Sequence, residues 1–438
     1  SRLHGALRQY IEATYHVGNP QLIQQRLELL NTPGVIHQEP FIESTPRYRS
    51  NESFSDLGLD PIVLDFFEQI SRSEAGHSPL IYDPPYEHQA AATRSALVDG
   101  KSLLVMTGTG SGKTECFLLP ILGKLALEAA HSPQTFAEPA LRALVLYPMN
   151  ALVNDQLGRL RLMFGDQRVV QFFTQHAGRP ARFARYTSRT LYPGVRDPGK
   201  DGTRLRSIGS FYVRQLELAA GPPSDEQRRA AELVERLRDR GKWPTKEDLT
   251  RWFGTPRTRW RNSDGEFVRC VTMPGDAELF TRHEVHQAPS DILVTNYSML
   301  EYMMMRPLER PVFDRTRQWL EDNPDQSFLM VIDESHMYRG AGGAEVALLL
   351  RRVRTRLNIP PERFQVICTS ASFRDENYAI EFAARLSGKS VSDFAPPIKG
   401  DLALRLPDDT GSEEEAELLA GIDLDAFHSA KTENEKRN

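Results

Sequence analysis

TGTGSGKTE, residues 107 to 115, directly follows the apolar run Leu103 to Met106. An apolar strand, a glycine-rich turn and a helix that opens at Lys-Thr form the arrangement that holds nucleotide phosphates. Gly110 and Gly112 carry no Cβ, so their backbone N–H groups can approach phosphate oxygens. Lys113 is expected to reach the β- and γ-phosphates, and the Thr114 hydroxyl to ligate Mg²⁺. The predicted nucleotide-binding residues of the turn are Thr107, Gly108, Thr109, Gly110, Ser111, Gly112, Lys113 and Thr114.

Two carboxylates follow a second apolar run. Phe328 to Ile332 shows no alternation and therefore predicts a buried strand, and Asp333 and Glu334 come directly after it. Parallel α/β sheets place their ligands at this end of a strand. Asp333 is predicted to hold Mg²⁺ through water, and Glu334 to deprotonate the water that attacks the γ-phosphate. A solvated acidic pair is the alternative, and the glycine turn makes it the weaker one.

Further polar residues fit the same site. Gln89, in Tyr86-Glu87-His88-Gln89, has an amide that can read N6 and N7 of adenine together, although a surface polar group is the commoner role. Ser370 and Ser372 follow a β-rich run and are predicted to couple the nucleotide to a neighbouring surface. Polar groups after two other apolar strands suit contacts to a nucleic-acid backbone. The residues predicted to make these contacts are Pro148, Asn150, Gln156, Thr295 and Asn296.

In this order the segments resemble the first RecA-like lobe of a superfamily 2 helicase of DEAD/DEAH type. YEHQ is similar to the Q motif, TGTGSGKTE to motif I, LYPMNALVNDQ to motif Ia, VTNYSMLEY to motif Ib, DESH to motif II and TSAS to motif III. HMYRGAGGAEVALLLRRVRTRL, residues 336 to 357, resembles a stretch of the DNA helicases related to the mitomycin-repair helicase. LYPMNALVNDQ and QEPFIESTPRY also resemble the large helicases of the DISARM and Druantia antiphage systems.

The resemblance implies an α/β fold, a doubly wound parallel sheet that forms a P-loop NTPase lobe. It implies ATP and Mg²⁺ as cofactors, DNA as a partner with 3′ to 5′ movement, a role in antiphage defence or DNA repair, and defence-system subunits as further partners. His336 joins the catalytic residues Lys113, Asp333 and Glu334 as part of motif II, and Tyr338 and Arg339 are expected on the path that couples nucleotide to DNA. Thr107 stands where the common P-loop pattern has glycine, Ser335 departs from the DEAD and DEAH spellings, and Ser372 replaces the usual threonine.

A motor of this class closes two lobes on ATP, and the second lobe supplies arginine fingers. The residues after Ser372 are too few for such a lobe. The chain is therefore expected to be one piece of a longer protein, with residues 399–438 as an acidic connector to the second lobe, and to be nearly inactive alone. Two alternatives stay open: a nucleotide-gated nucleic-acid-binding switch without strand separation, and an RNA-directed helicase.

Composition favours a soluble cytoplasmic enzyme. The 438 residues are 40% hydrophobic and 26% charged, with a net charge of −5, so a nucleic-acid path has to be a local patch. No stretch approaches twenty apolar residues and no leader pattern is present, which predicts neither a membrane span nor export. The three cysteines are scattered, as is typical of a reducing compartment.

Three regions are predicted. Residues 1–78 form a helical accessory region, in which Asn19 caps a helix that starts at Pro20. Residues 79–398 form the RecA-like lobe, with a mainly helical insert at about 178–273. The insert opens with arginines interleaved with aromatic residues, a pattern that suits nucleic acid, although a solvated face is about equally expected. The arginines predicted to contact nucleic acid are Arg179, Arg182 and Arg185.

Overall fold

The structure is a computed structural model. It describes residues 2–15, 17–32, 34–36, 47–73, 78–108, 110–191, 209–253, 272–371, 373, 375–403 and 412–421. The chain divides into two units, one of residues 48–402 and one that combines residues 1–47 with 403–438. Each unit is described by itself.

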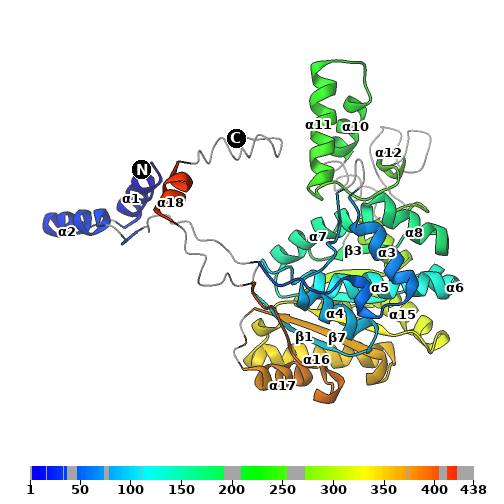
Figure 1. Cartoon of the computed structure of the whole chain (residues 1–438). Helices are drawn as coiled ribbons and strands as arrows, with labels where there is room; N and C mark the ends of the chain where they lie inside the picture. Colours follow the sequence, from blue (N-terminus) through cyan, green and yellow to red (C-terminus); the bar gives the residue numbers. More distant parts are fainter. Residues whose placement is uncertain are drawn as a thin grey trace. The chain divides into compact units, whose positions relative to one another are not determined.

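The larger unit is built on one parallel sheet of eight strands, in the order β4-β3-β5-β2-β6-β7-β1-β8 (Figure 1). Its two central strands, β2 and β6, are apolar throughout because helices cover both faces. This topology confirms the predicted α/β doubly wound fold. The strands are β1 Leu103–Met106, β2 Ala143–Tyr147, β3 Phe183–Tyr186, β4 Glu278–Leu279, β5 Ile292–Asn296, β6 Phe328–Ile332, β7 Phe364–Ser370 and β8 Ile398–Lys399.

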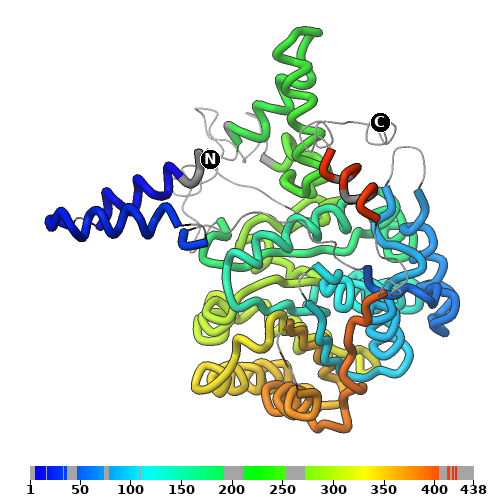
Figure 2. Tube along the Cα trace, turned by 60° about the vertical axis from the view of Figure 1, so that its left-hand side comes forward, coloured from blue at the N-terminus to red at the C-terminus, as the bar shows by residue number. Residues whose placement is uncertain are grey.

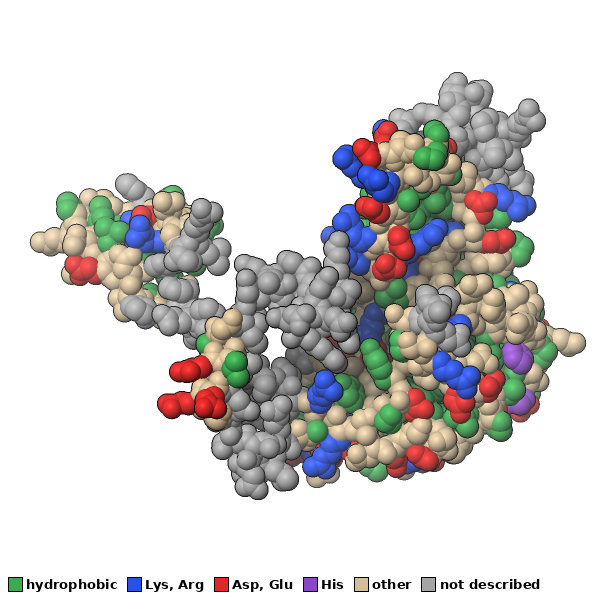
Figure 3. Space-filling model, turned by 45° about the horizontal axis from the view of Figure 1, so that its top comes forward, with side chains coloured by type: hydrophobic (Ala, Val, Ile, Leu, Met, Phe, Trp, Pro, Cys, Tyr) green, Lys and Arg blue, Asp and Glu red, His purple; other side chains and the backbone are tan. Residues whose placement is uncertain are grey.

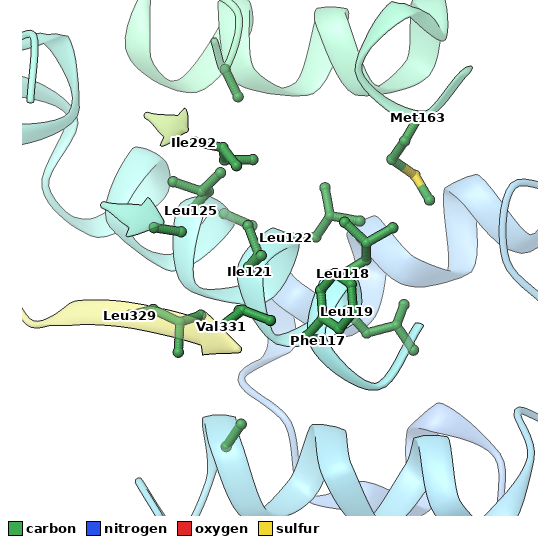
Figure 4. Packing of buried hydrophobic residues seen from close by; sticks show 14 of the residues in the cluster. Phe117, Leu118, Leu119, Ile121, Leu122, Leu125, Met163, Ile292, Leu329 and Val331 are labelled. Atoms are coloured by element: carbon green, nitrogen blue, oxygen red, sulfur yellow. The ribbon is translucent and has the colours of Figure 1, made fainter. Parts of the chain in front are cut away.

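Successive side chains of each strand enter two different cores. On β6, Leu329 and Val331 join one hydrophobic cluster, and Met330 and Ile332 join the other. Figure 4 shows Leu329 and Val331 beside side chains of α5, which carries the chain away from the glycine turn. Helices of the first cluster include α4 Glu87–Leu97, α5 Glu115–His131, α6 Pro133–Ala137, α7 Asn150–Gly165 and α8 Gln167–Ala177. The second cluster draws on α13 Arg282–Gln287, α14 Tyr297–Met305, α15 Arg310–Asp322, α16 Gly340–Leu357 and α17 Glu376–Ser387, and α16 and α17 lie together at the bottom of Figure 1.

Helix α3 (Pro61–Ser71) packs on the first core. Asp60 caps it, since its side chain accepts the N–H of Ile62, and Pro61 stands in the first turn. The ring of Phe66 stacks on Phe172 of α8, with 4.2 Å between ring centroids. This part of the predicted accessory region therefore shares a core with the lobe.

The insert projects from the lobe as a short π-helix (Gly209–Val213), α10 (Arg214–Ala219), α11 (Asp225–Asp239) and α12 (Leu249–Phe253) (Figure 1). Ser224 caps α11. The base of the insert has its own small core, which contains Trp243 and Trp252. Figure 3 shows basic and acidic side chains interspersed on this projection, as in the pair Arg228–Asp225.

Strand β3 lies within the range predicted to be insert. Phe183 and Ala184 pair with Ile292 and Leu293 of β5, so these residues belong to the main sheet. Residues 192–208 and 254–271, which hold the rest of the arginine-rich stretch, lie outside the described residues.

The smaller unit contains α1 (Arg2–Thr14), α2 (Pro20–Asn31) and α18 (Glu413–Ala420), coloured blue and red in Figure 2. The predicted cap is confirmed, since Asn19 Oδ1 accepts the N–H groups of Gln21 at 2.9 Å and Leu22 at 3.4 Å. Among the described helices of the whole chain, none combines the length and apolarity that crossing a bilayer requires.

Candidate nucleotide site

The glycine turn leaves β1 and closes on itself before α5 begins. Gly110 and Gly112 adopt φ values of +78° and +73°, a region that glycine enters without steric cost. Ser111 is buried, and its hydroxyl donates to Thr107 Oγ1 at 2.8 Å. Thr107 thus fixes the turn through its hydroxyl at the position where glycine is more usual. Thr109 lies outside the described residues.

Two side chains of helix α4 contact backbone carbonyls of the glycine turn. Gln89 Nε2 donates to the Gly112 carbonyl at 3.0 Å, and His88 Nε2 lies 2.9 Å from the Ser111 carbonyl. Gln89 Oε1 accepts the N–H of Tyr86 at 3.0 Å, so both ends of the amide already have partners. In this structure Gln89 therefore shapes the turn, and its role in reading adenine stays a prediction. His88 was not predicted from the sequence, where its only signal is its place beside Gln89.

The two predicted halves of the site meet. Lys113 Nζ lies 2.8 Å from Glu334 Oε1, although the residues are 221 positions apart. This follows from the sheet, since β7 pairs with both β1 and β6 and the strands end at one edge. Glu334 Oε2 lies 3.3 Å from His336 Nδ1, and Ser370 Oγ lies 3.2 Å from the same nitrogen.

Glu334 has a left-handed backbone, with φ at +50°. For a non-glycine residue this conformation costs free energy, and residues that adopt it are common at functional sites. Here the turn swings the Glu334 carboxylate back toward Lys113. The geometry therefore holds a carboxylate and an ammonium group ready beside the phosphate-binding turn.

Asp333 is more deeply buried than Glu334. Its Oδ1 accepts the hydroxyl of Thr369 and, at 3.0 Å, the N–H of Glu334. Burial raises the pKa of Asp333, and the charge of Glu334 adds to this, while Thr369 and Lys113 oppose it. Thr369 was missed by the sequence analysis, although it directly precedes Ser370.

The raised pKa of Asp333 leads to a stability prediction. Between its unfolded and its folded pKa the native state binds more protons, so stability falls as pH rises through this range, and the whole cost is present above the folded pKa. Asp333→Asn keeps an acceptor for Thr369 and removes the charge. We expect it to raise Tm without nucleotide and to abolish the further rise that Mg-ATP gives the parent protein, both measured by thermal unfolding. A lower Tm without nucleotide would contradict this.

The oxygen donors fit Mg²⁺. Asp333 offers a carboxylate and Thr114 a hydroxyl, which accepts Gln156 Nε2 at 3.4 Å. Among the described residues no cluster of three or more His, Cys, Asp or Glu could form a metal cage. Mg²⁺ bound with substrate phosphates needs only one or two protein ligands besides water, so this sparse set suits it.

The predicted nucleic-acid residues of the two other strands lie side by side. Tyr147 is paired with Asn296 where β2 and β5 end. Asn296 caps α14 and its amide donates to Asn150 at the start of α7. Thr295 is buried and donates to the Tyr186 carbonyl at 2.6 Å. Asn150, together with Pro148 and Gln156, is only half-buried at this edge, whereas Thr295 faces the protein interior.

The three predicted arginines have intramolecular partners. Arg179 forms two hydrogen bonds of 2.8 Å to Asp291 and lies over Phe136. Arg182 donates to backbone carbonyls near residues 273–276. Arg185 donates to Asn154 on α7 at 2.7 Å, and burial lowers its pKa. Arg185 thus lies beside α7, and contact of any of the three with nucleic acid stays a prediction.

The predicted coupling residues lie next to the acidic pair. Tyr338 is buried, and burial together with the charge of Asp333 raises its pKa. The Arg339 guanidinium lies 5.1 Å from the centre of the Phe373 ring. Ser370 is buried beside His336, while Ser372 lies outside the described residues.

Comparison with known proteins finds a family match for the part of the chain that carries the glycine turn. Residues 86–188 match the model of the DEAD/DEAH box helicases. The chain is 40% identical over 436 residues to the Druantia protein DruE of Escherichia coli, covering 96% of this chain and 23% of DruE. It is 32% identical over 104 residues to the uncharacterized ATP-dependent helicase YprA of Bacillus subtilis, covering 24% of this chain and 12% of YprA.

Among solved structures, the DUF1998 helicase MrfA bound to DNA and AMPPNP is similar to this chain at 17% identity, with a TM-score of 0.41, over 96% of this chain and 41% of that one. By length, the chain spans about a quarter of its relative DruE. The matched segment runs from the Gln89 helix through the glycine turn to the end of β3. This chain carries a DEAD/DEAH box helicase domain.

Proposed function

We propose that this chain supplies the ATP-binding lobe of a Mg²⁺- and ATP-dependent DNA helicase or translocase that acts in the cytoplasm. The observation that supports this most directly is the 2.8 Å contact between Lys113 and Glu334 at the edge where the glycine turn and the acidic pair meet. A phosphate-binding lysine and a general base within one site are what hydrolysis of a γ-phosphate requires.

Phosphate binding, proton transfer and metal binding fall to different residues of the site. Lys113 and the turn amides bind the β- and γ-phosphate oxygens, and phosphate then competes with Glu334 for Lys113. Glu334, freed from that ion pair and still beside His336, accepts the proton of the attacking water. Asp333, which Thr369 orients, and Thr114 would hold Mg²⁺, and the ion would offset the charge that develops on the phosphates.

The wider setting is also part of the proposal. A second lobe elsewhere in the protein contributes arginine to the γ-phosphate and closes the site when ATP is bound, so the 438-residue chain by itself turns over very slowly. Similarity to DruE supports a role in antiphage defence, with other defence subunits as partners. An intact Glu334 favours turnover over a nucleotide-gated switch, because a switch has no need of the base.

The test is ATP hydrolysis by the full-length protein with single-stranded DNA, duplex DNA and RNA. We expect DNA to raise kcat by about tenfold or more, corresponding to at least ~1.4 kcal/mol of barrier, and RNA to have a smaller effect. Stimulation by RNA alone would redirect the proposal to RNA. Hydrolysis that ignores nucleic acid altogether would argue against a motor.

A further inference from the structure

A cavity of about 360 Å³ lies at the amino ends of strands β2 and β6, whereas the nucleotide site lies at the carboxyl ends of the strands. It is lined by the C-terminal half of α5, by the first residues of β2 and β6, and by the loop before β6. Much of its wall is aliphatic, with Ile121, Leu125, Leu127 and Leu329. Figure 4 shows Ile121 and Leu125 of α5 near Leu329 of β6. A volume of this size is sufficient for a small organic ligand.

One cation in this cavity lacks a counter-charge. Lys124 Nζ donates to Ser327 Oγ at 2.7 Å, and this is the single partner recorded for its three N–H donors among the described residues. Burial alone lowers the pKa of Lys124 to about 8, with no carboxylate acting on it. The amine is therefore mostly protonated at neutral pH and is poorly solvated, which is costly for an ammonium group.

The other charges around the cavity are paired within the protein, except Asp325. Glu128 forms hydrogen bonds of 2.8 and 3.0 Å to Arg142, which also lies 3.1 Å from Asp291. His131 lies 3.2 Å from Asp60. Asp325 is exposed to solvent at the rim. An incoming anion would thus find Lys124 as its partner.

We propose that this cavity binds a small carboxylate with an apolar body, whose carboxylate pairs with Lys124 and whose hydrocarbon part lies against Ile121, Leu125 and Leu329. The anion supplies the missing counter-charge and accepts the spare donors, while the chain of carbons displaces water from aliphatic walls. Lys124 lies on the helix that starts at the nucleotide turn, roughly 14 Å along its axis from Glu115. The site is separate from the nucleotide site and does not depend on the proposed function.

The test is titration of the full-length protein with sodium hexanoate and with hexanamide, which has the same shape without the charge. Binding is measured by calorimetry and by saturation-transfer NMR. The parent protein is expected to bind hexanoate on the order of tenfold or more tightly than hexanamide, as a charge-assisted hydrogen bond provides. Lys124→Met keeps the aliphatic stem and is expected to lose that preference. Lys101→Met is the matched control, because Lys101 is exposed, does not line the cavity and donates its ammonium to the Ser392 carbonyl.

Each result is decisive. Equal affinity of the parent for hexanoate and hexanamide, or no hexanoate binding at all, would overturn the proposal. So would full hexanoate affinity in a folded Lys124→Met variant. If that variant does not fold, the comparison of the two ligands on the parent protein still decides the matter. Removal of a half-buried charge that has no counter-charge is expected to leave the fold at least as stable.

Discussion

Replacement of Glu334 by glutamine is expected to lower kcat for ATP hydrolysis by the full-length protein by about 10² to 10⁴-fold. Glutamine offers an oxygen to Lys113 but cannot accept the proton of the attacking water. ATP affinity should stay the same or increase, because phosphate then competes with a neutral amide for Lys113 instead of a carboxylate. Loss of the Glu334 charge also removes one cause of the raised pKa of Asp333, which keeps the metal ligand ionised.

The measurement pairs steady-state hydrolysis with equilibrium binding of a fluorescent ATP analogue. Glu381→Gln is the control, because Glu381 is exposed on α17 and pairs with Arg385 at 3.2 Å. It should leave both quantities unchanged. An unaltered kcat in Glu334→Gln would remove Glu334 from the role of general base, and weaker binding would assign it to nucleotide affinity instead.

The second large effect concerns a buried ion cluster at the base of the insert. The Lys246 side chain is 0% exposed, and its Nζ lies 2.6 Å from Glu284 and 3.0 Å from Asp276, which are also 0% exposed. Lys246→Met leaves two carboxylates without their cation, which is expected to cost about 3–5 kcal/mol. Amide hydrogen exchange in α12 and around β4 should therefore accelerate by about 10² to 10⁴-fold.

The comparison for this variant is Lys242→Met, in the same segment but exposed to solvent. It should leave exchange as in the parent protein. Adding Glu284→Gln to Lys246→Met should recover part of the loss, because it removes one unpaired charge while keeping an acceptor for Trp252 Nε1, which donates to Glu284 at 3.1 Å. Exchange that is unchanged in Lys246→Met would show that the cluster does not hold the insert in place.

Local patterns in the sequence predicted what depends on neighbouring residues. The apolar runs before Thr107 and Asp333 predicted strands buried on both faces, and the acidic pair was expected at the carboxyl end of its strand because parallel sheets bind ligands there. The meeting of Lys113 with Glu334 followed from the same topology. These inferences needed only periodicity and one rule about sheets.

Contacts that depend on three-dimensional packing could not be predicted in this way. Arg179 was predicted to face nucleic acid because arginines cluster around it, yet its guanidinium pairs with Asp291, 112 residues later. Strand β3 carries Arg185 among its four residues, so composition hid its place in the sheet. No sequence pattern predicted the hydrogen bond from Thr369 to Asp333 or the one from Gln89 to the Gly112 carbonyl.

The contact between Gln89 and Gly112 makes substitutions at these two positions depend on each other during evolution. A Cβ on Gly112 would lie 2.4 Å from Gln89 Nε2, and the φ of +73° would strain any other residue there. A lineage that acquires a side chain at position 112 therefore has to move or shorten the side chain of residue 89 in compensation. Among homologues, the pair is expected to co-vary, and glycine at 112 should accompany glutamine at 89.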